Sequence, residues 1–71
     1  MRDVELTKEP IELYKVLKFE GIVNSGAQAK LVIADGLVSL NGSVETQKRK
    51  KVKSGDVIVF AGEEIRLVME A

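Results

Sequence analysis

The chain has 71 residues and carries eleven basic and eleven acidic side chains, so its formal net charge is zero. A chain of this length builds one small core, and we expect residues 1–71 to form a single domain. It contains neither cysteine nor histidine, which excludes disulfides and thiolate metal sites and removes the commonest general base. We therefore expect a protein that is not an enzyme and uses no cofactor or metal.

We expect the chain to contain no membrane or targeting segment. Its longest uncharged apolar run is far shorter than the ~20 residues of a membrane-spanning helix. Residues 1–10 lack the apolar centre of a signal peptide. We expect a cytoplasmic protein without membrane association.

Two strands are predicted near the ends of the chain. Val4 and Leu6 alternate with acidic residues, which is the pattern of a half-buried strand. Ile65, Leu67 and Met69 alternate with Arg66 and Glu70, although Val68 on the outer face blurs the period. We expect these two strands to be neighbours.

A first helix is predicted over residues 11–20. Pro10 suits the first turn, where its missing N–H costs nothing, and Gly21 ends the helix. Lys15 and Lys18 fall on the outer side. The apolar stripe consists of Leu13, Val16, Leu17 and either Tyr14 or Phe19.

A second helix begins after Ser25, which has the side chain of a good N-cap. Gln28 lies three residues on and can reach back to the N–H of Ser25, which completes a capping box. A buried face follows, and Gly36 supplies the left-handed residue that ends the helix. The residues of that face are Ala29, Val32 and Ile33.

The second half of the chain predicts strands joined by tight turns. Residues 37–40 and 43–46 flank Asn41-Gly42, the strongest two-residue hairpin signal. Residues 54–56 and 61–64 are predicted as turns around an apolar strand over 57–60, which we expect to be central and covered on both faces. The predicted order is β-α-α-β-β-β-β. This is an α+β fold with two short helices packed on one side of a small antiparallel sheet.

The basic residues are unevenly placed along the chain. Five of the eleven stand within six positions that contain no acid, namely Lys48, Arg49, Lys50, Lys51 and Lys53. Such a run repels itself unless an anion relieves it, which favours a binding surface for phosphate. The alternative interpretation is an edge strand that lysines protect from aggregation.

The motifs of the chain resemble the S-four RNA-binding domain, also called the αL motif. The family pattern joins a short helix to S-R-x-x-A-x-x-x-I-x-x-G-x-V-x-V-N-G and ends in V-x-x-G-D-x-I. The resemblance covers residues 13–60, and short stand-alone bacterial members look most similar. The matching positions are Ser25, Ala29, Ile33, Gly36, Val38, Leu40, Asn41, Gly42, Val52, Gly55, Asp56 and Ile58.

The resemblance implies a module that binds structured RNA, ribosomal or tRNA-like, with a role in ribosome assembly or translation. It implies a monomer, with a ribosomal or RNA-processing protein as a further partner. The family's usual arginines are replaced by Glu12 and Gly26. Carried over to this chain, the RNA-binding residues are Ser25, Gly26, Lys30, Asn41, Lys48, Arg49, Lys50, Lys51 and Lys53.

Several of these residues also have purely structural interpretations. Gly26 either leaves room for a phosphate at the helix start or allows close packing, and Asn41 is first of all a turn residue. Lys30 is either a phosphate contact or a solvated lysine. We expect Tyr14 and Phe19 to belong to the core rather than to a base-stacking surface, which favours recognition by shape and phosphate contacts. The alternative function is a protein-interaction module that docks through its sheet edge.

Overall fold

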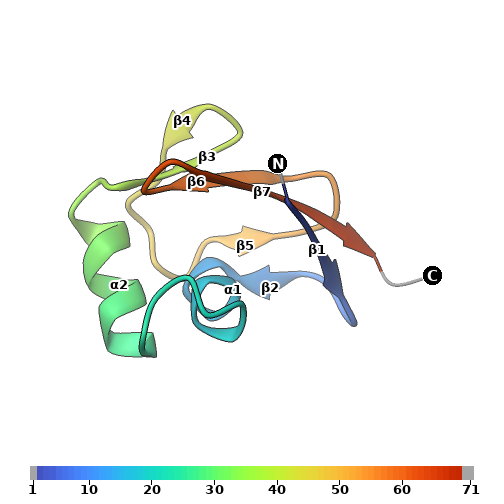
Figure 1. Cartoon of the computed structure of the whole chain (residues 1–71), viewed down its shortest axis with the longest axis horizontal. Coiled ribbons are helices and arrows are strands. Elements are labelled where there is room, and N and C mark those ends of the chain that lie inside the picture. Colours follow the sequence, from blue (N-terminus) through green and yellow to red (C-terminus); the bar gives the residue numbers. More distant parts are fainter. Residues whose placement is uncertain (1, 70–71) are drawn as a thin grey trace.

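The computed structural model of the chain describes residues 2–69 and is shown in Figure 1. In chain order its elements are β1 (Arg2–Leu6), β2 (Ile11–Glu12), α1 (Leu13–Phe19), α2 (Gly26–Ala34), β3 (Val38–Leu40), β4 (Ser43–Val44), β5 (Lys51–Val52), β6 (Val57–Phe60) and β7 (Glu63–Met69). The predicted α+β class is confirmed, and the short strands β2 and β5 are additional to the predicted order. Neither helix in this part of the chain is long and apolar enough to cross a membrane.

Five strands form the main sheet in the order β1-β7-β6-β3-β4. The two terminal strands are neighbours, as predicted, with Val4 opposite Leu67 and Leu6 opposite Met69. The prediction of a wholly antiparallel sheet is wrong, because this pair is parallel and the sheet is therefore mixed. Alternation of apolar residues assigns side chains to a face of a strand, but it carries no information on the direction of the neighbouring strand.

The strands β2 and β5 form a separate two-stranded ribbon, with Ile11 opposite Val52 and Glu12 opposite Lys51. The first helix therefore begins two residues later than predicted. The placement of Pro10 in its first turn is wrong, because Pro10 precedes β2. A strand of two residues leaves no period in a sequence, and its partner lies far along the chain, so local signals do not reveal it.

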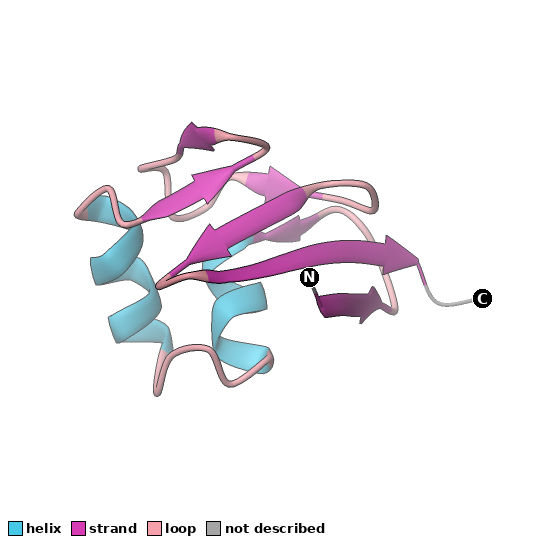
Figure 2. Ribbon diagram, turned by 45° about the horizontal axis from the view of Figure 1, so that its top comes forward, coloured by secondary structure: helices cyan, strands magenta, loops and turns pink. Residues whose placement is uncertain are grey.

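Both helices pack against the same face of the main sheet, as predicted (Figure 2). Complete burial of one large aliphatic side chain stabilises a fold by about 1.5–3 kcal/mol, so the cluster between helices and sheet supplies most of the stability. Its largest fully buried members are Leu13, Val16, Leu17, Ile33, Val38, Val52, Ile58, Ile65 and Leu67.

Two predictions about apolar residues are wrong. The strand β6 is central in the sheet, but Val57 and Val59 are only half-buried, because no element of the described chain lies over the outer face in Figure 2. Phe19 has 63% of its surface exposed at the end of α1 and is not a core residue. Tyr14 is half-buried and packs against the core.

The start of α2 is capped by Ser25, as predicted. The Ser25 Oγ accepts a hydrogen bond from the Gln28 N–H at 3.1 Å. The reciprocal bond is shifted by one residue, since Gln28 Oε1 accepts from the N–H of Asn24 at 2.8 Å rather than from that of Ser25. Two backbone donors at the helix start are thereby satisfied by side chains.

Both helices end at the predicted glycines. Gly21 and Gly36 have left-handed φ angles of 69° and 76°, a conformation that costs glycine little. After α2, the N–H groups of Gly36 and Leu37 donate to the carbonyls of Ile33 and Val32 at 3.0 and 3.1 Å. This pair of bonds is the Schellman motif.

The predicted Asn41-Gly42 turn closes the hairpin of β3 and β4, with φ angles of 53° and 87°. The return strand is shorter than predicted and ends at Val44. Asn41 also reaches beyond its own turn, because its Oδ1 accepts from the Val57 N–H at 2.8 Å and its Nδ2 donates to Asp56 Oδ1 at 3.0 Å. The other oxygen of Asp56 accepts from the Lys53 N–H at 2.9 Å. The hairpin turn and the turn before β6 are therefore held together.

We expect Ser25→Ala to lower the free energy of unfolding by about 1 kcal/mol, because the Gln28 N–H loses its capping acceptor. Thermal and urea melts measure the loss. Ser43→Ala is the matched control, since Ser43 is exposed on β4 and is not a cap residue of either helix. Equal stability of the two variants would show that the cap contributes nothing.

We expect Asn41→Gly to lower the free energy of unfolding by about 1–2 kcal/mol, because both side-chain hydrogen bonds disappear while the backbone conformation stays allowed. Ala61→Gly is the control, since Ala61 has the same φ of 53° and a side chain without polar atoms. We expect this control to be neutral or slightly stabilising. If both variants unfold at the same denaturant concentration, the Asn41 amide does not hold the two turns together.

Candidate nucleic-acid interface

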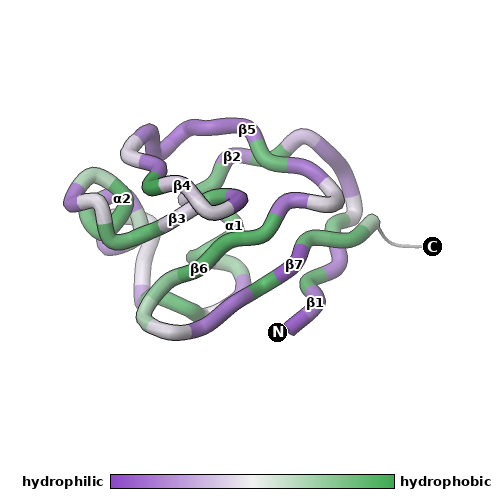
Figure 3. The backbone as a smooth tube through the Cα atoms, turned by 90° about the horizontal axis from the view of Figure 1, so that it is seen from above, coloured by the Kyte–Doolittle hydropathy of each residue, from purple (hydrophilic) through white to green (hydrophobic). Residues whose placement is uncertain are grey.

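Residues 48–50, which precede β5 and which we call the basic segment, are fixed to the start of α1 by backbone hydrogen bonds. Leu13 N–H donates to the carbonyl of Lys50 at 2.9 Å, and Tyr14 N–H donates to the carbonyl of Lys48 at 3.1 Å. No side chain caps this helix at its N-cap residue, Glu12. The carbonyls of the basic segment therefore satisfy donors that every helix start leaves free. In Figure 3 the hydrophilic tube leads into β5 next to β2.

Glu12 is an acid surrounded by cations. Its carboxylate lies 3.2 Å from Lys15 Nζ and 3.9 Å from Arg49 Nε, and its backbone pairs with Lys51. The hydrogen bond from Lys15 lowers the pKa of the Glu12 carboxyl, against an opposing effect of burial and with help from the charges of Lys51 and Arg49. Because the pKa is lowered on folding, these contacts stabilise the fold at higher pH and lose their effect as the pH falls through the lowered pKa.

The second helix joins this group of cations through Tyr14. Lys30 Nζ of α2 lies 4.7 Å from the centre of the Tyr14 ring on α1, which is a cation–π contact. A Cβ on Gly26 would lie 4.0 Å from the same ring and 3.6 Å from Lys18 Cδ. Gly26 thus lies close to α1, which fits the packing interpretation, and the gap is wide enough for an ordinary side chain.

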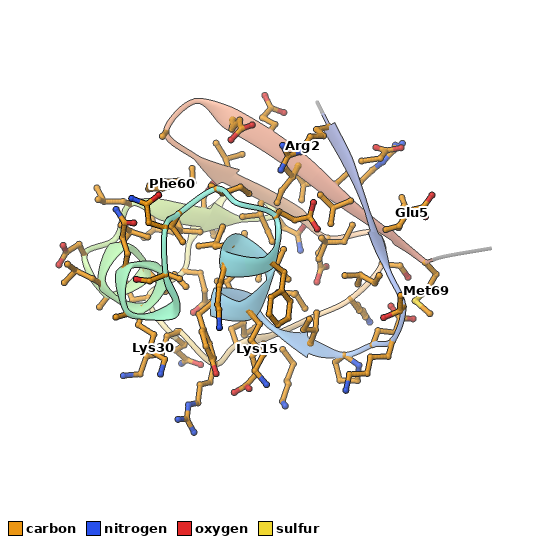
Figure 4. The ribbon with its side chains drawn as sticks, turned by 60° about the horizontal axis from the view of Figure 1, so that its bottom comes forward. Arg2, Glu5, Lys15, Lys30, Phe60 and Met69 are labelled. Atoms are coloured by element: carbon orange, nitrogen blue, oxygen red, sulfur yellow. The ribbon has the colours of Figure 1, made fainter. Side chains whose placement is uncertain are left out.

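These contacts place six basic residues around the start of α1. Five of them are predicted site residues, and the sixth is Lys15. In Figure 4, Lys15 and Lys30 lie along the same lower edge of the molecule. We call this surface the basic face. It consists of Lys15, Lys30, Lys48, Arg49, Lys50 and Lys51.

Three predicted site residues lie outside the basic face and make structural hydrogen bonds there. The hydroxyl of Ser25 caps α2, and the amide of Asn41 holds Asp56 and Val57. Lys53 lies in the turn before β6, where Asp56 accepts from its backbone N–H. Their roles in binding stay predictions, as do those of the basic face.

Sequence reasoning did not place Lys15 in the site, although one signal pointed to it. Lys15 stands three residues after Glu12, the spacing at which an acid and a base meet on a helix. The contact of Lys30 with Tyr14 had no such signal, because it joins two helices across their packing interface.

Paired short helices, a tight hairpin and cations gathered at the first helix define the class of this chain. It is a small α+β domain with the αL motif. The chain belongs to the S4 domain family, whose family model matches residues 4–68. The resemblance seen in the sequence is therefore confirmed.

The chain is 46% identical over 69 residues to YbcJ of Escherichia coli (strain K12), which covers 96% of this chain and 99% of YbcJ. The same identity and coverage hold for YbcJ of Shigella flexneri. The solution structure of Escherichia coli YbcJ matches with a TM-score of 0.73 over 96% of this chain and 87% of that one, and its αL motif is described as involved in RNA binding. The similarity thus extends over nearly the whole of both chains.

A more distant structural match is the 30S ribosomal protein S4e from Thermoplasma acidophilum. Its TM-score is 0.64 at 25% identity, over 83% of this chain and 31% of that protein. The domain described here therefore corresponds to one part of a larger ribosomal protein.

We expect Lys15→Gln to raise the pKa of the Glu12 carboxyl toward its ordinary value, because the Lys15 hydrogen bond is the main cause of the lowering. Arg49→Gln should raise it less, since Arg49 acts only through its charge at 3.9 Å. NMR titration of the Glu12 carboxyl carbon measures both effects. A larger change in the Arg49 variant would contradict the assignment of Lys15 as the main partner.

Proposed function

We propose that this chain is a non-catalytic cytoplasmic module that binds structured RNA, ribosomal or tRNA-like, through its basic face. The observation that carries the proposal is the backbone connection of Lys48 and Lys50 to the start of α1, which holds a run of cations beside Lys15 and Lys30. The description of the YbcJ motif as involved in RNA binding supports the same function.

A fixed basic segment suits phosphate binding better than a free loop. Ordering a flexible residue costs about 1–2 kcal/mol of backbone entropy, and a segment already ordered by the fold does not incur that cost on binding. Its lysine and arginine side chains remain exposed. They retain their reach toward phosphates while their backbone is fixed.

The composition of the basic face favours recognition of folded RNA by shape. Lysines act as point charges on phosphates and do not read base edges in the way that a bidentate side chain does. The major groove of an A-form helix is too deep and narrow to be read by side chains. We therefore propose that the pattern of phosphates on a folded RNA selects the partner, and that the role lies in ribosome assembly or translation.

An exposed apolar surface on the hairpin supports a second candidate function, docking onto a protein. Leu37 and Val44 are 57% and 65% exposed, and Val44 lies beside Gly36, where an added Cβ would meet its Cγ1 at 3.7 Å. Salt distinguishes the two functions, because phosphate binding weakens steeply as salt rises whereas burial of apolar surface does not.

We expect Lys48→Gln with Arg49→Gln to weaken binding to a ribosomal RNA fragment and to flatten the log–log salt slope by about 1.4–1.8, because each phosphate that a cation neutralises accounts for ~0.7–0.9 of that slope. Arg2→Gln with Arg66→Gln is the matched control. It removes the same charge from residues paired with Glu63 and Asp3. Filter binding at several salt concentrations measures both slopes.

The fold of both double variants should survive, because exposed ion pairs contribute at most about 1 kcal/mol. Circular dichroism melts verify this before the titrations. Equal slopes for the two variants would contradict an RNA contact at the basic segment. Binding that is insensitive to salt in the wild-type chain would favour the protein-docking function.

A further inference from the structure

A groove follows α1 where it faces β1 and the connection to β2, and it consists of two adjoining hollows. The first has a volume of about 160 Å³, and its lining includes the apolar side chains of Val4, Leu6 and Val16. The second has a volume of about 280 Å³, and its lining includes Lys8, Lys15 and Lys51. Ile11, Phe19 and Lys8 line both hollows, so the two hollows adjoin, and we treat them together as one groove.

The two ends of the groove differ in chemistry. One end is mainly apolar, although Glu5 and Glu20 also line it. It opens beside the exposed ring of Phe19, with the Lys18 ammonium 5.7 Å from the ring centre. The other end carries three lysines against a single acid, Glu12, whose carboxylate is already paired with Lys15. The groove therefore complements a ligand that joins a flat apolar ring to an anionic group.

We propose that this groove holds one unpaired nucleotide of the bound RNA. Its base lies on Phe19 and Ile11, and its phosphates lie beside Lys8 and Lys51. The proposal rests on the proposed function, because Lys15 and Lys51 belong to both the basic face and the groove. An RNA strand on the basic face thus enters the groove without leaving the protein surface.

The exposure of Phe19 is the reason to prefer a nucleotide to a simple phosphate. Folded RNA displays its sequence mainly at unpaired bases, which proteins hold by stacking them on aromatic rings. Such stacking strengthens binding by roughly 5- to 150-fold per base. Phe19 is the one mostly exposed aromatic ring in the described part of the chain, and it lies next to cations that fit the attached phosphates. The basic face supplies affinity for folded RNA, and the groove adds selection for an unpaired base at one point.

Two RNA hairpins that differ by one base test this inference. The first carries a single unpaired adenosine, and the second carries an abasic nucleotide at the same position, so their charges are equal. We expect the full-length wild-type chain to bind the adenosine hairpin about tenfold more tightly. Phe19→Leu should abolish this preference and leave the affinity for the abasic hairpin within about twofold, because leucine lacks a stacking ring.

A conservative variant provides a direct readout. The chain contains no tryptophan, so Phe19→Trp introduces a single tryptophan at the groove, whose fluorescence can be excited selectively over that of Tyr14. We expect this variant to keep the preference and its fluorescence to fall with the adenosine hairpin but not with the abasic one. A separate variant tests the end of the groove that carries the lysines. Lys8→Gln should flatten the log–log salt slope of binding to both hairpins by about 0.7–0.9, whereas Arg66→Gln on β7 should leave that slope unchanged.

The outcomes separate this inference from the proposed function. Equal wild-type affinity for the two hairpins, or a preference that survives in Phe19→Leu, overturns the groove assignment and leaves the RNA-binding function standing. Absence of binding to either hairpin overturns both. NMR titration with adenosine monophosphate tests whether the groove binds a free nucleotide instead. Shifts at Ile11 and Phe19 without any hairpin preference would identify a site for free nucleotides and would also overturn the assignment.

Discussion

Two backbone hydrogen bonds at the start of α1 determine where the basic residues of this protein lie. They run from Leu13 to Lys50 and from Tyr14 to Lys48, and they continue the β2–β5 ribbon into the helix. A buried or structured helix start needs acceptors for its free N–H groups, and leaving one unmet costs about 1–3 kcal/mol. Here the acceptors are main-chain carbonyls. The side chains of the same residues are therefore not required for capping and remain available for a ligand.

A second connection orients the hairpin. Asp56 accepts from Lys53 with one oxygen and from Asn41 with the other, while Asn41 also accepts from Val57. The N-G and G-D parts of the family pattern are thus two halves of one hydrogen-bonded unit, although they stand fifteen residues apart. Each of these bonds is partly exposed and individually contributes only about 0.5–1.5 kcal/mol. Their value lies in fixing the position of the hairpin relative to β6.

Local features of the fold could be predicted from the sequence, and long-range ones could not. The Ser25 cap, the glycine helix ends and the Asn41-Gly42 turn are determined by residues within one turn of chain, and these predictions are confirmed. The parallel pairing of β1 with β7 and the strand β2 depend on partners far along the chain. The exposure of Phe19 also depends on tertiary packing, because helical spacing allowed either Tyr14 or Phe19 beside the buried stripe and Tyr14 is the one that packs against the core.

The candidate site follows the same division. The basic run at residues 48–53 could be recognised in the sequence, since its members are neighbours along the chain. Its relation to Lys15, Lys30 and Glu12 could not, because that relation is created by the packing of α1 against α2 and β5. Lys8 offered no signal at all, since a lone lysine in a connection resembles any solvated residue.

The neutral charge of the chain is compatible with a phosphate-binding surface because its charges are separated in space. Arg2 and Glu5 lie on the opposite side of the molecule from Lys15 and Lys30 in Figure 4. The molecule measures 33 × 22 × 18 Å, whereas charges are screened beyond about 8 Å at physiological ionic strength. A phosphate at the basic face therefore experiences the nearby lysines more strongly than the acids at the far ends of β1 and β7. Glu12 lies within this range, and its pairing with Lys15 offsets part of the attraction that the surface offers to an anion. Glu5 and Glu20 line the mainly apolar hollow of the groove and also act against an anion there.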